Sequence, residues 1–217
     1  MTKNNEQIWE NIYAKGLSNL RYPNELFVRL FNGYILNNQV EKVLDYGFGA
    51  GANLIHMVEA GVSTSGVEVS ESAIKLVDEK LNEKKLQAEL KKIENGKIPF
   101  PDNYFDVVVA WQVLVYNDMK SYFNAFAEIS RVLKKDGYFI GTMTATGDIT
   151  HKMSERVGNY EYISKVSTQE GAKCIIIEKE DLQEFFPNQS INIGEYLFEI
   201  NGNVSHHWTV TYKNEKE

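Results

Sequence analysis

The segment 43–51, with the sequence VLDYGFGAG, constrains the fold of this chain more than any other segment. β-prone residues lead to Asp45, glycines follow at 47, 49 and 51, and a helix-like segment begins at Asn53. A strand that runs through a glycine-rich turn into a helix is typical of the nucleotide-type site in doubly wound α/β proteins. The glycines allow the backbone to approach a ligand closely, and N–H groups at the start of a helix favour polar or anionic groups. Such a turn also occurs for purely steric reasons. Other segments of the chain are therefore needed to distinguish a ligand-binding turn from a steric one.

The composition argues against a nucleic-acid partner. The 217 residues suit one domain, 43% of them are hydrophobic, and the formal net charge is -7, whereas phosphate backbones need clustered Lys and Arg. No apolar run approaches the roughly 20 residues that span a bilayer, and the first residues lack the apolar core of a signal peptide. We therefore expect a cytoplasmic protein, monomer or homodimer, with no membrane partner. The single Cys174 and the 4 histidines are too few to predict a metal site.

A second strand, at 62–69, ends at a candidate ribose-binding acid. Glu68 lies about 20 residues after the first glycine of the turn, the offset at which an acid at the tip of the second strand reaches a ribose. A carboxylate suits that task because it accepts hydrogen bonds from both the 2′ and the 3′ hydroxyl. The adjoining Val69 belongs to the same candidate site, and Ser70 is the predicted cap of a helix at 71–85. A surface glutamate at a strand end is the alternative interpretation of Glu68.

Strand-like and helix-like segments alternate regularly up to residue 143. Further strands are expected at 88–93, 107–111 and 138–143, so a mostly parallel sheet with helices on both faces is predicted. Beyond that point the pattern loosens, and we expect a substrate-side insertion at about 144–178. The chain closes with two extended runs joined by Asn-Gly-Asn at 201–203, which predicts a hairpin whose last strand is antiparallel to its neighbour.

Four segments together resemble class I S-adenosylmethionine-dependent methyltransferases. The D-x-G-x-G-x-G pattern at 45–51 matches the first motif of that family, and 66–68 matches its ribose-binding acid. The run IPFPDNYFD and the apolar run after it, 98–114, match the segment that leads into the fourth strand. Residues 131–137, RVLKKDG, match the turn before the fifth strand, with an acid where a glycine is common. The resemblance covers about residues 40–143.

The resemblance implies a Rossmann-like, three-layer α/β/α fold with a seven-stranded, mostly parallel sheet whose last strand is antiparallel. It implies S-adenosylmethionine as the cofactor, laid across the tips of the first, second and fourth strands. Residues 1–36 would form a helical cap over the active site of a domain at 37–217, because Trp9 and Tyr13 match an aromatic helix that covers the cofactor in small-molecule members. The register of Glu94, which the resemblance implies near the adenine amine, is disturbed by the Asn-Gly-Lys that follows it. The implied cofactor-binding residues are Trp9, Tyr13, Asp45, Gly47, Phe48, Gly49, Glu68, Val69, Glu94, Trp111 and Gln112.

A narrower resemblance concerns the methyl acceptor. The segments 18–23, 111–118 and 205–211 are similar to bacterial methyltransferases associated with surface-polysaccharide building blocks. This similarity implies a small polar acceptor, with the methyl group placed on an oxygen of a sugar, nucleotide-linked or phosphorylated precursor. A hydroxyl acceptor benefits from a general base, and the last strand begins at the face where the parallel strands end. The candidate bases at that face are His151, His206 and His207. The candidate substrate-binding residues are Arg21, Tyr22, Tyr116 and Arg156.

Two other interpretations stay open. The G-x-G-x-x-A pattern at 47–52 also satisfies a loose dinucleotide fingerprint, and Tyr116 with Lys120 imitates the Tyr/Lys pair of a reductase, so an NAD-dependent oxidoreductase is the main alternative. Asp45, which precedes the glycines, and the segment IPFPDN at 98–103 argue against an oxidoreductase. The other alternative is a non-catalytic, cofactor-binding partner protein.

Overall fold

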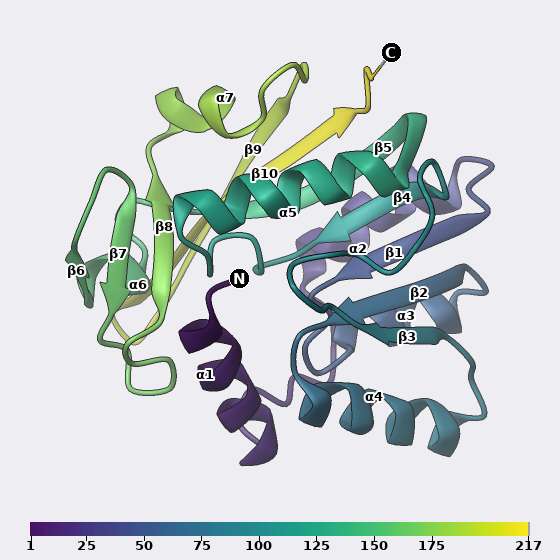
Figure 1. Ribbon diagram of the computed structural model, residues 1–217, viewed down its shortest axis with the longest axis horizontal. Helices are drawn as coiled ribbons and strands as arrows, with labels where there is room; N and C mark the ends of the chain where they lie inside the picture. Colours follow the sequence, from purple (N-terminus) through teal and green to yellow (C-terminus); the bar gives the residue numbers. More distant parts are fainter. Residues whose placement is uncertain (217) are drawn as a thin grey trace.

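The central sheet of the computed structural model, which describes residues 1–216, has the predicted seven strands at its core. Their spatial order is β3-β2-β1-β4-β5-β10-β9 (Figure 1). Each of the first five pairs in parallel with its neighbour, whereas β10 pairs antiparallel with both β5 and β9. The prediction of a mostly parallel sheet with an antiparallel last strand is therefore confirmed. The strands are β1 (Lys42–Tyr46), β2 (Ser63–Glu68), β3 (Glu89–Lys92), β4 (Phe105–Ala110), β5 (Leu133–Ala145), β9 (Asn192–Ile200) and β10 (Asn203–Lys213).

Three further strands extend this sheet within the segment predicted as an insertion. They are β6 (Ser154–Arg156), β7 (Glu161–Ser164) and β8 (Lys173–Ile177), and the short helix α6 (Ile149–Lys152) precedes them. β8 pairs in parallel with Thr144 and Ala145, the last two residues of β5, and β10 pairs antiparallel with residues 138–144 of the same strand. The sheet therefore forks at the end of β5, which gives ten strands in the described chain where seven were predicted.

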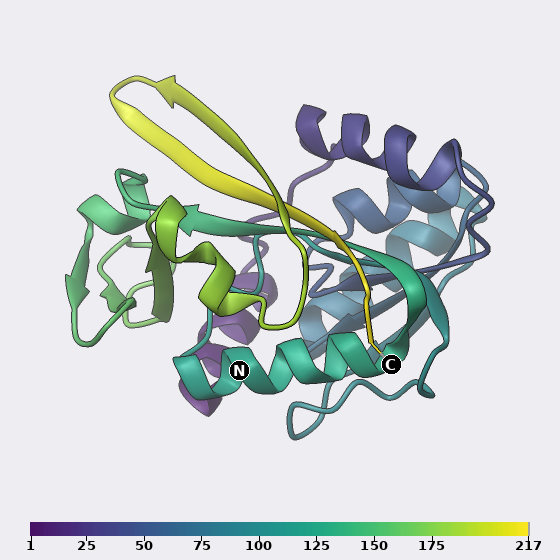
Figure 2. The same cartoon turned by 90° about the horizontal axis from the view of Figure 1, so that it is seen from above.

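Helices cover both faces of the sheet. One face holds α5 (Met119–Val132) and α7 (Leu182–Phe185), which follows a 3-10 turn at Lys179–Asp181. The other face holds α2 (Glu25–Phe31), its π-helical continuation Asn32–Leu36, α3 (Ala52–Glu59) and α4 (Glu71–Lys84). Figure 2 shows α5, in teal at the bottom, and α2, in indigo at the top, on opposite sides of the sheet. This is the three-layer arrangement that the alternation of segments predicted.

Local sequence accounts for where several of these elements begin. The Asn24 side chain accepts a hydrogen bond from the Leu26 N–H and caps α2, and the Ser70 hydroxyl accepts one from the Ala73 N–H and caps α4. β4 carries the consecutive fully buried residues 107–110, the pattern of a strand that is covered on both faces. The burial of β4 on both faces holds this strand in the core, and its carboxyl end borders the site described below.

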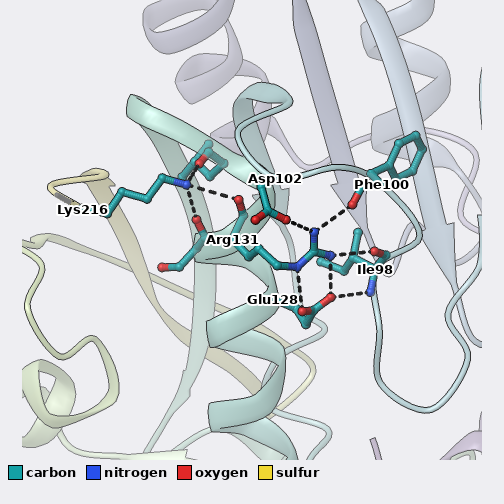
Figure 3. A network of polar contacts seen from close by, with 8 residues as sticks. Ile98, Phe100, Asp102, Glu128, Arg131 and Lys216 are labelled. Carbon is teal, nitrogen blue, oxygen red and sulfur yellow. Dashed lines mark hydrogen bonds and ion pairs between the residues drawn. The ribbon is translucent and has the colours of Figure 1, made fainter.

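The run that leads into β4 is held by a network of polar contacts around Arg131 on α5 (Figure 3). Its guanidinium donates to the carbonyls of Ile98 and Phe100 and pairs with the carboxylates of Asp102 and Glu128 at 2.7 Å each. Hydrogen bonding to the guanidinium lowers the pKa of Glu128. Because this network lies at the amino end of β4, it supports the strand from the end opposite to the site.

The helix α1 (Lys3–Ala14) lies apart from these layers, between α4 and the β6–β8 extension (Figure 1). Of the two helices in the predicted cap, only α1 lies there, because α2 packs Phe27 and Phe31 into the core against the sheet. Within residues 1–216, no helix is both long enough and apolar enough to cross a membrane.

Candidate active site

The glycine turn after β1 has a backbone that only glycine adopts easily. Gly47, Gly49 and Gly51 have φ values of 71°, 52° and 81°. A Cβ at Gly47 would lie 2.2 Å from the Val113 side chain, and a Cβ at Gly49 would lie 2.4 Å from the hydroxyl oxygen of Tyr13. The turn is therefore approached closely from two sides, by the segment after β4 and by α1.

Glu68, at the end of β2, ties that strand to the glycine turn. The carboxylate is 6% exposed and accepts hydrogen bonds from the backbone N–H groups of Gly49 (2.9 Å), Val69 (2.7 Å) and Ser70 (3.2 Å). Burial raises the pKa of Glu68 and outweighs these hydrogen bonds, which favour the charged form. The acid predicted from the sequence thus lies next to the turn, as the offset of about 20 residues required.

Asp45 is the second buried acid of the site. It is 2% exposed, and its Oδ2 has no hydrogen-bond partner among the residues that the structure describes. Burial, followed by repulsion from Glu68, raises the pKa of Asp45 to about 7. Both buried carboxyl groups of the site therefore have raised pKa values, the effect of burial on an acid.

The helix α1 is fastened over the turn at both of its ends. Near its start, Asn5 donates to the carbonyls of Tyr116 (2.9 Å) and Lys173 (2.8 Å). Near its end, the Glu10 carboxylate accepts hydrogen bonds from the hydroxyls of Ser70 (2.7 Å) and Ser72 (2.5 Å) at the start of α4. These contacts hold the aromatic side chains of α1 against the ends of β1 and β4.

A cavity of about 240 Å³ lies between α1, the glycine turn and the end of β4. The indole Nε1 atoms of Trp9 and Trp111, which both line it, are buried and have no hydrogen-bond partner within the described residues. Trp9 also packs edge-on against Tyr116, with ring centroids 4.8 Å apart. A smaller adjoining cavity of about 40 Å³ reaches Glu68. The predicted cofactor residues that line one or both cavities are Trp9, Tyr13, Gly47, Phe48, Gly49, Glu68, Trp111 and Gln112.

The end of β4 connects the cavity to the β9–β10 hairpin. Gln112 has a left-handed backbone with φ 53°, and its N–H donates to the Thr142 hydroxyl at 2.8 Å. Its side-chain amide donates to the Tyr196 hydroxyl at 3.0 Å and lies 3.4 Å from Nε2 of His207. The Trp111 ring packs edge-on against Phe27 of α2, which fixes its orientation.

The three candidate bases have different surroundings. Nδ1 of His151 accepts a hydrogen bond from the Gly147 N–H at 3.0 Å, and neither the cavity nor Gln112 is in contact with that ring. The two nitrogens of His206 lie 2.8 Å from the Thr146 carbonyl and 2.8 Å from the Glu195 carboxylate. Only His207 reaches the residues that line the cavity, because neighbouring residues of a strand point to opposite faces.

Four other predicted residues lie at or beyond the margin of the cavity. Tyr22 lines it and also borders, with Arg21, a separate cavity of about 510 Å³ beside α3 and α4. Arg156 is exposed on β6 and donates to the Gly158 carbonyl at 3.1 Å, and Glu94 is exposed in a turn paired with Lys97, so the structure brings neither of them to the cavity.

Two predicted cofactor residues serve mainly the core. The Phe48 side chain packs with Leu54 and Ile55 of α3. Val69 packs against the core, and its N–H is already bonded to Glu68. Phe48 also lines the cavity, whereas Val69 lines neither of the two cavities.

Sequence reasoning missed two residues of the site, Asp148 and Tyr196. Asp148 is 2% exposed, caps α6 by accepting from the Thr150 N–H at 2.7 Å, and accepts from the His206 N–H at 2.8 Å. The Asp-Ile-Thr start of a helix was a detectable capping pattern. Tyr196 depends on the pairing of β9 with β10, which local sequence does not reveal.

Comparison with known sequences identifies the segment that carries these features. Residues 43–137 match the family model of the methyltransferase domain. A demethylmenaquinone methyltransferase of Tropheryma whipplei is 27% identical over 100 residues, which are 46% of this chain and 40% of that protein. A sterol 24-C-methyltransferase of Gibberella zeae is 34% identical over 101 residues, which are 45% of this chain and 26% of that protein. The chain thus spans less than half the length of these two curated relatives.

Solved structures share the whole fold. A methyltransferase from Methanosarcina mazei, described as dependent on S-adenosylmethionine, superimposes with a TM-score of 0.72 at 19% identity, over 87% of this chain and 98% of that one. The 1,6-didemethyltoxoflavin N1-methyltransferase of Burkholderia thailandensis, solved with its substrate and S-adenosylhomocysteine, gives 0.73 at 14% identity, over 97% and 87%. At such identities the likeness establishes the fold.

The sheet order, the glycine turn and the acid after β2 define the class I methyltransferase fold. The resemblance found in the sequence is confirmed over residues 43–137, which match the methyltransferase domain, and the fold is shared with a methyltransferase described as dependent on S-adenosylmethionine. The residues present fit that cofactor. The buried carboxyl groups of Asp45 and Glu68 have raised pKa values that a nearby cation would lower, which suits a molecule with a sulfonium and an ammonium group. The unpartnered indole N–H groups of Trp9 and Trp111 supply donors.

Proposed function

We propose that this protein transfers a methyl group from S-adenosylmethionine to an oxygen of a small-molecule acceptor. The observation that carries the proposal is the meeting of the glycine turn, the buried carboxylate of Glu68 and the end of β4 at two adjoining cavities under α1. Ligands of open α/β sheets bind outside the carboxyl ends of the strands, where these cavities lie.

Each part of the cavity has a separate task in holding the cofactor. The backbone at Gly47 and Gly49 would face the methionine part, and the Glu68 carboxylate suits the two ribose hydroxyls. Trp9 and Tyr13 would cover the cofactor from α1, while Trp111 and Gln112 border the methyl group. When bound, S-adenosylmethionine supplies an electrophilic methyl carbon, and the electron pair of the broken S–C bond stays on sulfur when an acceptor oxygen takes that carbon. The protein contributes position and exclusion of water, which lower the barrier of such a displacement.

His207 is the base that this arrangement supports best. Burial lowers the pKa of His207 to about 4, so its imidazole is neutral at pH 7. Its Nδ1 faces the Ser205 hydroxyl at 3.4 Å and the Asp148 carboxylate at 3.8 Å, which assigns the proton to Nδ1. Nε2, which lies 3.4 Å from the Gln112 amide nitrogen, therefore carries the lone pair that would take the proton of an acceptor hydroxyl.

The names of the relatives bear on the chemical class of the methyl acceptor. The relatives named above are named for small molecules, a demethylated menaquinone, a sterol and a didemethyltoxoflavin, which supports a small-molecule acceptor here. The prediction of a sugar, nucleotide-linked or phosphorylated precursor of a surface polysaccharide rests on three short segments of sequence and stays a prediction.

The environment of Tyr116 supports methyl transfer over the NAD-dependent alternative. A reductase tyrosine has to release its proton easily, whereas burial raises the pKa of Tyr116. The Tyr116 ring is instead packed against Trp9 and lines the cavity.

Titration calorimetry with S-adenosylmethionine and with NADH tests the proposal. We expect binding of S-adenosylmethionine and none of NADH, and the reverse would establish the oxidoreductase alternative. A second assay measures release of S-adenosylhomocysteine over a panel of hydroxylated metabolites. Binding without any turnover across that panel would favour the non-catalytic partner protein.

A further inference from the structure

We propose that one face of the β9–β10 hairpin binds the methyl acceptor, and that this acceptor is an uncharged, planar aromatic ring bearing a hydroxyl group. The proposal rests on the proposed methyl transfer and names the substrate class for it. We call the surface the aromatic platform and define it as Trp111, Tyr196, Phe198 and His207.

The four rings of the platform are nearly parallel. The ring planes of Trp111 and Tyr196 differ by 9°, with centroids 6.4 Å apart, and those of Tyr196 and Phe198 differ by 11°, with centroids 6.1 Å apart. The imidazole of His207 lies 5.3 Å from Tyr196 at an interplanar angle of 8°. Tyr196 and Phe198 alternate along β9, and His207 is the register partner of Tyr196, so these three side chains share one face of the hairpin.

The outer part of this face is apolar and uncovered. Phe198 is 44% exposed and Ile200, on the same face, is 61% exposed. Nearer the core, the Tyr34 hydroxyl after α2 bonds to the Thr211 hydroxyl at 3.1 Å and covers the base of the same face. Figure 2 shows the outer half of the hairpin, in lime to yellow, extending beyond the helices. Exposed aromatic side chains next to a ligand cavity are typical of a binding surface.

The inner end of the platform is continuous with the cofactor cavity. Trp111 lines the cavity and is also the innermost ring of the platform. Gln112 lines the cavity as well, and its amide donates to the Tyr196 hydroxyl at 3.0 Å. An acceptor ring in contact with Tyr196 and Phe198 would therefore have one edge towards the end of β4, where the methyl group is expected.

The polar groups of the platform suit an acceptor that has one hydroxyl group and carries no charge. At the inner end stand the Gln112 amide, the Tyr196 hydroxyl and Nε2 of His207. The carboxylates of β9, Glu195 and Glu199, belong to the opposite face by the alternation of the strand, and Glu195 is paired there with His206 at 2.8 Å. A sugar or a phosphorylated acceptor would need several more donors and charges than this face offers.

The test compares two alcohols of the same skeleton, planar 1-naphthol and saturated 1-decalol, by calorimetry with the protein saturated in S-adenosylhomocysteine. Stacking on an aromatic side chain contributes about 0.5–1.5 kcal/mol beyond buried area, so 1-naphthol should bind about two- to tenfold more tightly than 1-decalol. Equal affinities, or tighter binding of methyl glucoside or of a nucleotide sugar, would overturn the proposal.

Variants then locate the binding surface. Phe198→Ala should remove most of the preference for 1-naphthol, and Phe198→Leu, which keeps apolar bulk without a π face, should remove it too. Leu197→Ala is the matched control, because Leu197 is 58% exposed on the opposite face of the same strand. Equal effects of the substitutions at Phe198 and Leu197 would refute the platform.

Two further measurements separate this proposal from others. The affinity for S-adenosylhomocysteine is measured first and should be the same in all variants. If the wild-type protein does not bind S-adenosylhomocysteine, the proposed function is refuted, whether or not 1-naphthol binds. Sedimentation velocity tests whether a second copy covers the platform. Self-association that Phe198→Ala abolishes, without any binding of 1-naphthol, would assign this face to a dimer and overturn the acceptor site.

Discussion

Replacing Asp45 by asparagine should stabilise the folded protein above pH 7 while weakening its hold on the cofactor. The buried carboxyl of Asp45 has a pKa of about 7, against 3.8 for an ordinary aspartate. At about 1.4 kcal/mol per pKa unit, this difference corresponds to about 4 kcal/mol of unfolding free energy. Because the folded-state pKa is raised, the unfolded chain loses its proton first as pH increases, so the stability conferred by the neutral carboxyl is full below about pH 4 and is lost as pH rises through 7.

Chemical denaturation of the wild-type protein and of Asp45→Asn between pH 4 and pH 8 measures this difference. We expect the variant to gain stability relative to the wild type as pH increases, by up to about 4 kcal/mol at pH 8. His207 acts in the opposite sense in both proteins, because its lowered pKa of about 4 removes stability as pH falls below 6.5. The difference between the two proteins therefore isolates Asp45.

The matched control is Asp78→Asn, which makes the same chemical change at an exposed position on α4. It should leave the pH dependence of unfolding unchanged. A variant at Asp45 that is less stable than the wild type at pH 8, or whose stability runs parallel to the wild type at every pH, would show that the carboxyl is not held in a destabilising environment.

Three other substitutions test separate parts of the site. Glu68→Gln should weaken binding of S-adenosylmethionine by about 1–3 kcal/mol, the loss of a charged hydrogen-bonding group, and unchanged affinity by calorimetry would refute the ribose assignment. His207→Asn should lower kcat for a hydroxyl acceptor by about 10²- to 10⁴-fold, whereas His206→Asn should not, and equal losses in steady-state kinetics would remove the distinction between them. Gly49→Ala should lower the unfolding free energy more than Gly16→Ala; both residues have positive φ, but only at Gly49 would a Cβ meet another side chain within 4 Å. Equal shifts in the melting temperature would mean that α1 moves aside without cost.

The sequence was sufficient for the sheet and for the floor of the site. The spacing from Gly47 to Glu68, the apolar run of β4 and the Asn-Gly-Asn turn are local patterns, and each predicted an element or a residue that the structure has. The alternation of strands with helices predicted a mostly parallel sheet with helices on both faces, and the family resemblance implied its seven strands.

What the sequence left open depends on contacts between distant segments. His206 and His207 were equivalent candidates, and only the pairing of β10 with β5 and β9 decides which one faces Gln112. Strand-like runs at 160–166 and 173–178 indicated β7 and β8, but the sequence did not reveal β6 or the pairing of β8 with the end of β5. Tyr196 had no motif to identify it.

The fork in the sheet divides the β9–β10 hairpin into two parts that should exchange amide hydrogens at different rates. Residues 207–211 of β10 are paired on both sides, with β5 and with β9, whereas 203–206 are paired with β9 alone. Opening of the outer part breaks one ladder and exposes little core, so its protection should reflect local fraying, while the inner part should exchange only with wider unfolding. The hairpin thus combines a rigid base, which holds His207, with a tip that can adjust to molecules of different length.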